Sequence, residues 1–356
     1  MTTPRQRAHS FSQRYGLRVP ILLAPMAGAC PPSLSVAVAE AGGMGACGAL
    51  LMSPTEIAEW AAAVRQATPG PFQLNLWIAQ PAPRRDPAAE AATRRFLAAW
   101  GPAVAEDAGD AALVDFDAQC EALLAARPAV ASSIMGVFPP RFVERLKAAG
   151  IAWFANATTV AEAKAAAAAG ADAIVAQGME AGGHRGAFDA ALAEAQQVGL
   201  FALLPAIVDA VGVPVIAAGA IADARGVAAA LMLGASAVQI GTGFLRAPEA
   251  GLHPAWAQAL AVTAPEDTLV SRAFSGRPGR SIATAYARAA TAPDAPPPAP
   301  YPVQRGLTAA MRKAAQARGD VHAMQAWAGQ AAALAPAEPA QQIVHRLWTG
   351  AGALLR

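Results

Sequence analysis

Short apolar runs alternate with longer, alanine-rich segments along most of the chain. Continuous apolar runs of this kind are typical of strands buried on both faces, and the segments between them are long enough for helices. The runs predict eight strands, at residues 20–24, 43–47, 72–77, 129–134, 152–155, 173–176, 214–218 and 237–240. Because each strand is followed by a predicted helix, we expect an α/β fold, a (β/α)8 TIM barrel. A doubly wound open sheet is the alternative, although it usually has fewer repeats.

Helix-start and helix-end signals agree with this alternation. Ser53, Pro54 and Glu56 have the spacing of an N-cap, a first-turn proline and a capping box, which predicts a helix after the second strand. Further helices, each closing on glycine or another small residue as helix C-termini commonly do, are expected at residues 139–150, 159–170 and 222–235.

Two segments exceed a minimal barrel. A helical insertion lies between the third and fourth strands, at residues 83–128, on the side where a barrel carries its function. After the eighth strand, a mostly helical C-terminal segment, residues 251–356, is interrupted by the proline-rich stretch 291–302, which reads as a stiff connector. We therefore expect residues 1–250 to form the barrel and both additions to pack over its mouth, where they cover the active site.

Charge and cysteine content exclude several classes of function. The formal net charge is +2 and the arginines form no stripe, which argues against nucleic acid as a partner. Cys30, Cys47 and Cys120 are far apart and lack CxxC spacing, so we expect neither a disulfide framework nor a metal site. The N-terminus has no apolar signal region, and no apolar run approaches ~18 uninterrupted residues. We therefore expect a cytoplasmic protein with no membrane contact.

Glycine-rich loops follow the seventh and eighth predicted strands. They read AAGAIADARG at residues 217–226 and QIGTGF at residues 239–244. Barrels of this kind often hold phosphate there, because glycine leaves backbone N–H groups accessible and a helix N-terminus favours negative charge. Either loop alone is equally well explained by turn glycines, but the two together indicate a phosphorylated cofactor.

Two other strand ends carry groups suited to a flat heterocycle. The first strand ends in APMAGA, residues 24–29, where Pro25 and Met26 would offer backbone and an apolar edge to a ring. A tight turn with a core methionine is the alternative. Asn75 on the third strand faces the same side as Trp77. A buried amide needs polar partners, which either the protein core or the edge of a heterocycle would provide.

The segment QGMEAGGHRG, residues 177–186, is the clearest candidate for catalysis. His184 alone among five histidines lies in a glycine-rich loop at a strand end, where it could accept a proton or stabilise an anion. Arg185 is the candidate counter-charge, with a structural or solvated arginine as the alternative. Glu180 would either orient His184 or hydrogen-bond the loop backbone. Without a nucleophile elbow, a Walker loop or metal-ligand spacing, redox chemistry on an organic cofactor is the economical hypothesis.

The order of these motifs resembles the nitronate monooxygenase family, formerly called 2-nitropropane dioxygenases. The matching segments cover nearly the entire chain: APMAG, AGGMGACGA, NL, QGMEAGGHRG, VPVIAAGAI, QIGTGF, SRAFSGRPGR, YPVQ and WAGQAA. The resemblance implies a barrel that binds FMN non-covalently and oxidises an alkyl nitronate, with oxygen completing the turnover to a carbonyl compound and nitrite. Propionate 3-nitronate, a plant and fungal toxin, is the implied substrate, and detoxification the implied role.

The resemblance also implies roles for individual residues. His184 would be the catalytic histidine, and Arg185 and Tyr301 would contact the substrate. The glycines of this loop would let its backbone lie against the flavin ring while His184 points at the nitronate. The family's flavin contacts would fall on Asn75, Gln177, Gly182, Gly219, Gln239, Ile240, Gly241 and Thr242. Together with these, we expect Ala24, Pro25 and Met26 at the end of the first strand and Gly183 in the histidine segment to bind the cofactor.

The chain departs from the family pattern at two positions. Ala220 stands where the family commonly has a second glycine, and Ile134 stands where the best-known class has a histidine. FMN-dependent NADH:quinone reductases and enoyl-acyl-carrier-protein reductases share much of the framework and are the alternative function. A barrel that binds a phosphate ligand without redox chemistry is a remote alternative. We expect a monomer or homodimer.

Overall fold

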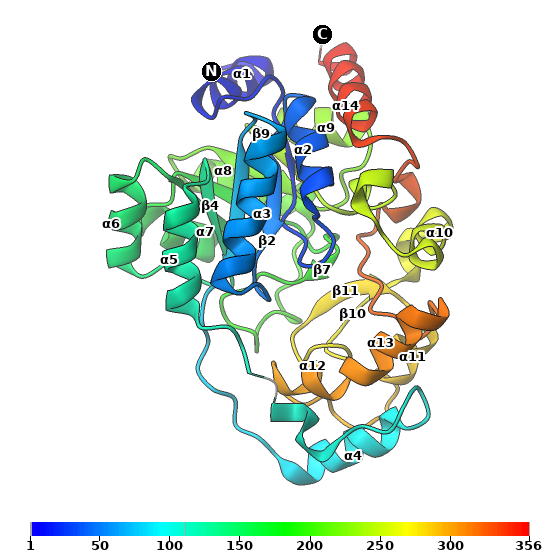
Figure 1. Ribbon diagram of the computed structural model, residues 1–356. Helices are drawn as coiled ribbons and strands as arrows, with labels where there is room; N and C mark the ends of the chain where they lie inside the picture. Colours follow the sequence, from blue (N-terminus) through cyan, green and yellow to red (C-terminus); the bar gives the residue numbers. More distant parts are fainter. Residues whose placement is uncertain (1, 111, 356) are drawn as a thin grey trace.

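A computed structural model describes residues 2–110 and 112–355 and places a cap over one end of a parallel β-barrel (Figure 1). The barrel strands follow the order β1-β9-β8-β6-β5-β4-β3-β2. A parallel bridge between Leu22 and Met44 joins β1 to β2 and closes the barrel. The strands are β1 (Ile21–Leu23), β2 (Gly45–Gly48), β3 (Phe72–Trp77), β4 (Val130–Ile134), β5 (Ala152–Ala157), β6 (Ala173–Gln177), β8 (Val215–Ala218) and β9 (Ala237–Ile240).

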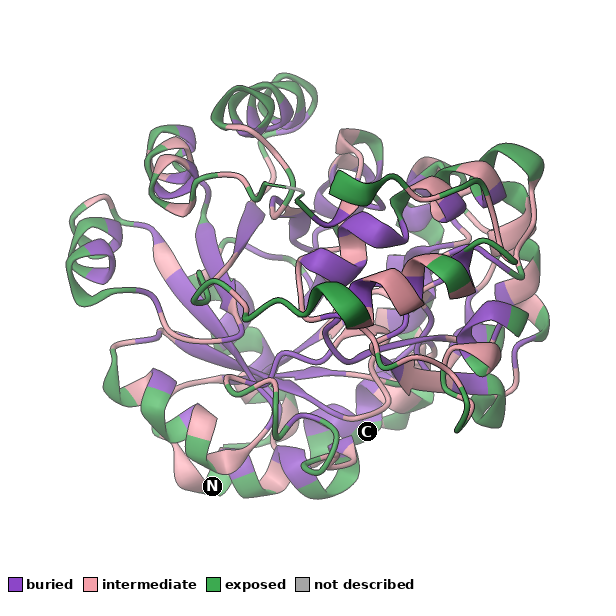
Figure 2. Ribbon diagram, turned by 90° about the horizontal axis from the view of Figure 1, so that it is seen from below, coloured by how far each residue is buried: buried purple, intermediate pink, exposed green. Residues whose placement is uncertain are grey.

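The predicted TIM barrel is confirmed, and each predicted strand is present with bounds that differ by a few residues. Most strand residues are buried, because side chains fill the barrel interior and helices cover its outside. Figure 2 shows buried strands inside a ring of helices whose outer faces are exposed. The helices that cover the strands are α2 (Pro32–Glu40), α3 (Pro54–Ala67), α5 (Phe116–Ala126), α6 (Pro140–Ala148), α7 (Val160–Ala168), α8 (Leu200–Ala210) and α9 (Ala224–Met232).

The capping box predicted after the second strand is confirmed at the start of α3. The Ser53 hydroxyl accepts a hydrogen bond from the Glu56 backbone N–H at 3.3 Å, and the Glu56 carboxylate accepts one from the Ser53 N–H at 2.7 Å. Both unpaired backbone donors are thereby satisfied, so the helix begins where the sequence predicts.

The N-terminal helix α1 (Pro4–Arg14) covers the end of the barrel opposite the cap. Phe11 and the adjoining Tyr15 pack against Phe154 near the start of β5, with ring centroids 6.0 and 4.9 Å apart. These aromatic contacts form part of an apolar cluster at the amino ends of the strands. The carboxyl ends of the strands therefore remain for a functional site.

The last helix, α14 (Ala340–Leu354), packs on the barrel beside α2 and α9 (Figure 1). It takes the place of the helix that would directly follow β9, and Ile343, Val344 and Leu347 on its apolar face are buried in the barrel core. The sequence predicts that this helix, as part of residues 251–356, covers the active site. The structure instead places it in the ring of barrel helices.

The cap has its own apolar core, built from two separate stretches of the chain. The connection from β3 supplies α4 (Pro87–Leu97), whereas α5, also within the predicted insertion, packs on the barrel helix α3. The chain after β9 supplies the remaining cap helices, α10 (Pro254–Val262), α11 (Ala285–Ala289), α12 (Val303–Leu307) and α13 (Ala309–Arg318).

The chain after β9 also contributes two strands, β10 (Thr268–Ser271) and β11 (Gly279–Ile282), where the sequence predicted mostly helix. They form an antiparallel sheet with β7 (Gly183–His184), which lies in the loop after β6. His184 pairs with Gly279 in this sheet. The barrel loop that carries the predicted catalytic histidine is therefore fixed to the cap by backbone pairing.

Candidate active site

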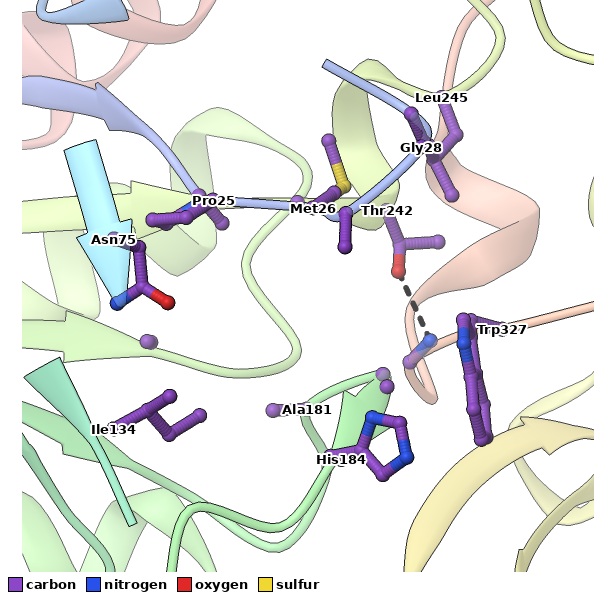
Figure 3. Close-up of a pocket in the computed structure, with 18 of the residues that line it drawn as sticks. Pro25, Met26, Gly28, Asn75, Ile134, Ala181, His184, Thr242, Leu245 and Trp327 are labelled. Atoms are coloured by element: carbon purple, nitrogen blue, oxygen red, sulfur yellow. Dashed lines mark hydrogen bonds between the residues drawn. The ribbon is translucent and has the colours of Figure 1, made fainter. Parts of the chain in front are cut away.

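A cavity of about 440 Å³ lies between the carboxyl ends of the barrel strands and the cap. All twelve residues predicted to bind the cofactor line this cavity, and so do His184 and Tyr301. Figure 3 shows Asn75 and Ile134 on one side and His184 and Trp327 on another, with Pro25 and Met26 above them. Arg185 is the one predicted site residue that does not line it.

Loops at the ends of β8 and β9 leave backbone donors free at one part of the cavity wall. Gly219 has a φ of 122° and Ala220 a φ of 52°, so both adopt left-handed backbone conformations. Within the described chain, no backbone carbonyl accepts a hydrogen bond from the N–H of Ala220 or of Gly241. The helix α9 begins directly after the first loop, at its N-cap Asp223. Free N–H groups beside a helix N-terminus suit a phosphate group.

Side-chain amides line the inner faces of neighbouring strands. The Asn75 Nδ2 group donates to Ser132 Oγ at 3.1 Å, so the core partner proposed for this amide is present. Asn156 on β5 also lines the cavity and is 8 % exposed, yet its Nδ2 group has no acceptor in the described chain. A buried donor of this kind is costly unless a ligand accepts from it. Asn156 therefore indicates a ligand with a polar edge.

Gln177 fixes the loop that carries His184, residues 178–186 (the histidine loop), through both polar atoms of its side-chain amide. Its Nε2 group donates to the carbonyl of His184 at 3.1 Å, and its Oε1 atom accepts from the N–H of Gly186 at 2.8 Å. The side chain lines the cavity as the resemblance predicts, but these two hydrogen bonds serve the loop.

The imidazole of His184 lies between two tryptophans and a serine. Its ring centroid is 4.8 Å from the rings of both Trp77 on β3 and Trp327 in the chain after α13. The Nε2 atom is hydrogen-bonded to Ser275 Oγ at 2.7 Å. Three segments that are distant in sequence thus fix the orientation of this side chain.

The surroundings of His184 keep its imidazole neutral. Burial, together with the nearby positive charges of Arg277 and Arg305, lowers its pKa to about 3. At neutral pH the ring therefore acts through hydrogen bonds and carries no charge. The same two arginines surround it with positive potential, which favours an anionic ligand.

Arg185 points away from the cavity, in contrast to the prediction that it contacts the substrate. It is 1 % exposed, and its Nη1 group donates to the carbonyl of Gly178 at 2.6 Å. Because β7 pairs with β11, the side chain that follows His184 is directed into the loop interior. The structural alternative for this arginine is thus the one that the geometry supports.

Glu180 does not orient His184. Its carboxylate accepts from the N–H of Leu200 at 2.9 and 3.0 Å, at the start of α8. The alternative proposed from the sequence was a hydrogen bond to the loop backbone, whereas the observed partner is the backbone of α8. A negative charge at a helix N-terminus is favourable, so this residue fixes the loop to α8.

Two positions of the histidine loop require glycine, each for a different structural reason. A Cβ atom on Gly182 would lie 2.5 Å from the backbone nitrogen of Gly329, so two backbones touch at this point. Gly183 has a φ of 75°, a left-handed conformation that glycine adopts without strain. The prediction from the sequence places these glycines against the flavin, and the structure shows that Gly182 also accommodates the chain after Trp327.

Tyr301 and Ile134 complete the part of the wall near His184. The Tyr301 ring lies 5.4 Å from the ring of Trp77, and its buried hydroxyl has no partner in the described chain. Ile134 faces the cavity where the best-known class has a histidine. The wall at this position is therefore apolar.

Several cavity residues come from the C-terminal motifs and received no individual role from the sequence. Ser275 belongs to the SGRP motif and Trp327 to the WAGQ motif, so the motifs were signals for both positions. Arg305 and Arg312 lie in helical stretches where an arginine is usually solvated, and no local signal marks them.

Other kinds of site find no support in the described residues. No three His, Cys, Asp or Glu side chains of residues 2–110 and 112–355 gather as metal ligands would. In the same part of the chain, no helix has the length and apolar character needed to cross a bilayer.

Comparisons with known proteins agree along the whole chain. The family described as nitronate monooxygenase matches residues 11–350. Nitronate monooxygenases of Paraburkholderia phytofirmans and Pseudomonas aeruginosa are 39 % and 38 % identical, over 93 % and 95 % of this chain and 92 % and 97 % of theirs.

Solved structures give the same picture. A nitroalkane oxidase from Streptomyces ansochromogenes is similar with a TM-score of 0.87 and 35 % identity, covering 96 % of this chain and 98 % of that chain. FabK from Thermotoga maritima has a TM-score of 0.76 and 28 % identity, covering 97 % of this chain and 96 % of that chain.

Proposed function

The chain belongs to the nitronate monooxygenase family, and on this premise we propose that it is an FMN-dependent enzyme oxidising alkyl nitronates of the propionate 3-nitronate type. The products would be a carbonyl compound and nitrite, with oxygen as the oxidant. One observation supports an anionic substrate most directly. The neutral His184 lies in a cavity wall whose nearby charges, those of Arg277 and Arg305, are positive.

The described residues fit FMN at both ends of the molecule. The free N–H groups of Ala220 and Gly241 suit its phosphate, and the unpartnered Asn156 amide suits a polar edge of its ring. Pro25 and Met26 would contact the ring from the apolar side. Bound FMN would supply the electron acceptor for the nitronate and return the electrons to oxygen.

His184 would hold the nitronate through a hydrogen bond. A nitronate is already an anion, so its oxidation requires no base to remove a proton. The depressed pKa of His184 makes it a poor base for a neutral nitroalkane, whereas a neutral imidazole can still donate or accept a hydrogen bond. The hydrogen bond with Ser275 fixes which part of the ring faces the cavity.

Anaerobic mixing with substrate tests this proposal. The purified protein should contain FMN, identified by chromatography after release, and its visible absorbance should bleach within the mixing time when propionate 3-nitronate is added. NADH added alone should leave the flavin oxidised. Rapid bleaching by NADH without any reaction with the nitronate would instead support the reductase alternative. Absence of flavin, even after FMN is added, would favour the non-redox barrel.

We propose a cytoplasmic monomer or homodimer that acts on a small-molecule nitronate and oxygen. Cell fractionation and size-exclusion chromatography with light scattering measure these two properties.

A further inference from the structure

The cavity wall formed by the cap carries excess positive charge. Arg305 on α12 and Arg312 on α13 both line the cavity, and none of its lining residues in the described chain is an aspartate or glutamate. Charged groups removed from water usually pair with an opposite charge. The described lining residues therefore provide no negative charge to balance these arginines, and an anionic ligand would supply it.

Arg305 lies close to the groups proposed to contact the substrate. Its positive charge contributes to the lowered pKa of His184 and opposes the rise in the pKa of Tyr301 that burial causes. Within the described residues, its guanidinium takes part in no hydrogen bond or ion pair, and its backbone carbonyl accepts from Arg312 Nη2 at 2.8 Å. The side chain is half-buried, so it can reach a ligand inside the cavity.

Arg312 is hydrogen-bonded only to neutral groups within the described chain, so its positive charge is not balanced there either. Its Nε group donates to Thr308 Oγ1 at 3.1 Å and its Nη1 group to Gln325 Oε1 at 3.2 Å. Burial lowers its pKa to about 10, with a further contribution from Arg305, so it stays charged at neutral pH. Arg312 therefore adds a second positive charge next to Arg305.

We propose that Arg305 binds a second anionic group of the substrate and makes the enzyme selective for nitronates that carry one. This inference rests on the proposed nitronate oxidation. The planar guanidinium matches a carboxylate in a bidentate geometry, while His184 and Tyr301 contact the nitronate end. The FMN phosphate does not fill this role, because the loops that suit it belong to the barrel wall at β8 and β9.

Two nitronates that differ only in the second charge test the inference. Propionate 3-nitronate carries a carboxylate where propyl 1-nitronate has a methyl group. We expect kcat/KM of the wild-type holoenzyme to be higher for the carboxylate substrate. The selectivity ratio is kcat/KM for propionate 3-nitronate divided by kcat/KM for propyl 1-nitronate. In Arg305→Met this ratio should fall by about 10- to 100-fold, the usual range for a charge-assisted hydrogen bond. Most of the change should appear in KM for the carboxylate substrate.

Two further variants separate the local contact from general effects. Arg305→Lys keeps the charge but loses the bidentate geometry, so it should restore part of the ratio. Arg318→Met removes an arginine from the exposed C-terminal end of α13, outside the cavity, and should leave the ratio at the wild-type value. FMN content, measured for each variant, checks that the protein is folded and loaded.

The outcomes distinguish this inference from the proposed function. Oxidation of both nitronates with a ratio that Arg305→Met leaves unchanged would overturn the role of Arg305 and leave nitronate oxidation intact. If the wild-type holoenzyme oxidises neither nitronate, the proposed function itself fails, and this inference fails with it.

Discussion

His184 combines a fixed orientation with a neutral charge, and each property has its own structural cause. Orientation comes from Ser275 and the two flanking tryptophans, and neutrality comes from burial beside two arginines. Because the flavin would be held by other residues, His184→Ala should retain FMN. Its turnover of nitronate should fall by about 10²–10³, the usual effect of removing one preorganised hydrogen-bonding group.

Steady-state kinetics with a flavin-content assay measures this effect. His9→Ala changes an exposed histidine on α1, at the other end of the barrel, and serves as the matched control. Full turnover in His184→Ala would mean that the histidine serves only the structure of its loop.

The same residue makes stability depend on pH. The folded protein holds His184 neutral down to a pKa of about 3, whereas an unfolded chain protonates histidine near its ordinary value of about 6.5. The contribution of the neutral ring is therefore fully present above the unfolded value. It is lost as the pH falls from there toward 3, because only the unfolded state takes up the proton.

Urea unfolding of wild-type protein and His184→Asn, carried out between pH 7 and pH 4, measures this linkage. The stability of the wild type should decrease more steeply with falling pH than that of the variant, which lacks the titrating ring. Parallel curves would show that His184 is protonated in the folded state over this range.

At the scale of elements, the loop after β6 is in direct contact with the chain after α13. Gly182 and Gly329 touch through their backbones, and two hydrogen bonds flank the contact, Gly329 N to Thr242 Oγ1 at 3.0 Å and Gln330 N to Glu180 O at 2.9 Å. In Gly182→Ala the new methyl group would force these segments apart. We expect a loss of stability of about 1–3 kcal/mol and weaker FMN binding.

Thermal or urea unfolding together with FMN titration measures both effects. Gly212→Ala is the control, since a Cβ atom there meets open space and its backbone is not left-handed. If both variants behave alike, the close approach of the two backbones has no energetic importance.

At the scale of the whole molecule, the barrel is complete only when the end of the chain returns to it. Leu347 on α14 is 1 % exposed within the barrel core, although the cap separates this helix from β9 in the sequence. Leu347→Ala should lower the free energy of unfolding by about 2–5 kcal/mol, because the cavity it leaves lies in the barrel itself.

Denaturant unfolding of the holoenzyme, followed by fluorescence, tests this expectation. Leu354→Ala, on the same helix but 57 % exposed, should change stability by less than about 0.5 kcal/mol. A wild-type unfolding curve for Leu347→Ala would mean that α14 is dispensable for the barrel.

The sequence by itself determined the barrel and the location of its site. Apolar runs predict strands reliably here because parallel strands are buried on both faces, and the glycine loops at 217–226 and 239–244 follow directly from those strands. Fourteen of the fifteen predicted site residues, His184 among them, line one cavity because carboxyl ends of neighbouring barrel strands meet at one rim.

Only the tertiary structure decided which surfaces the remaining segments cover and where single side chains point. An amphipathic pattern shows that one face of α14 is buried but not against which core, so its return to the barrel was not predictable. Arg185 faces the loop interior because β7 pairs with β11, and the short strands β10 and β11 have no alternation to reveal that pairing. Arg305 lines the cavity because the cap packs over the barrel mouth, and that packing depends on contacts between residues far apart in the chain.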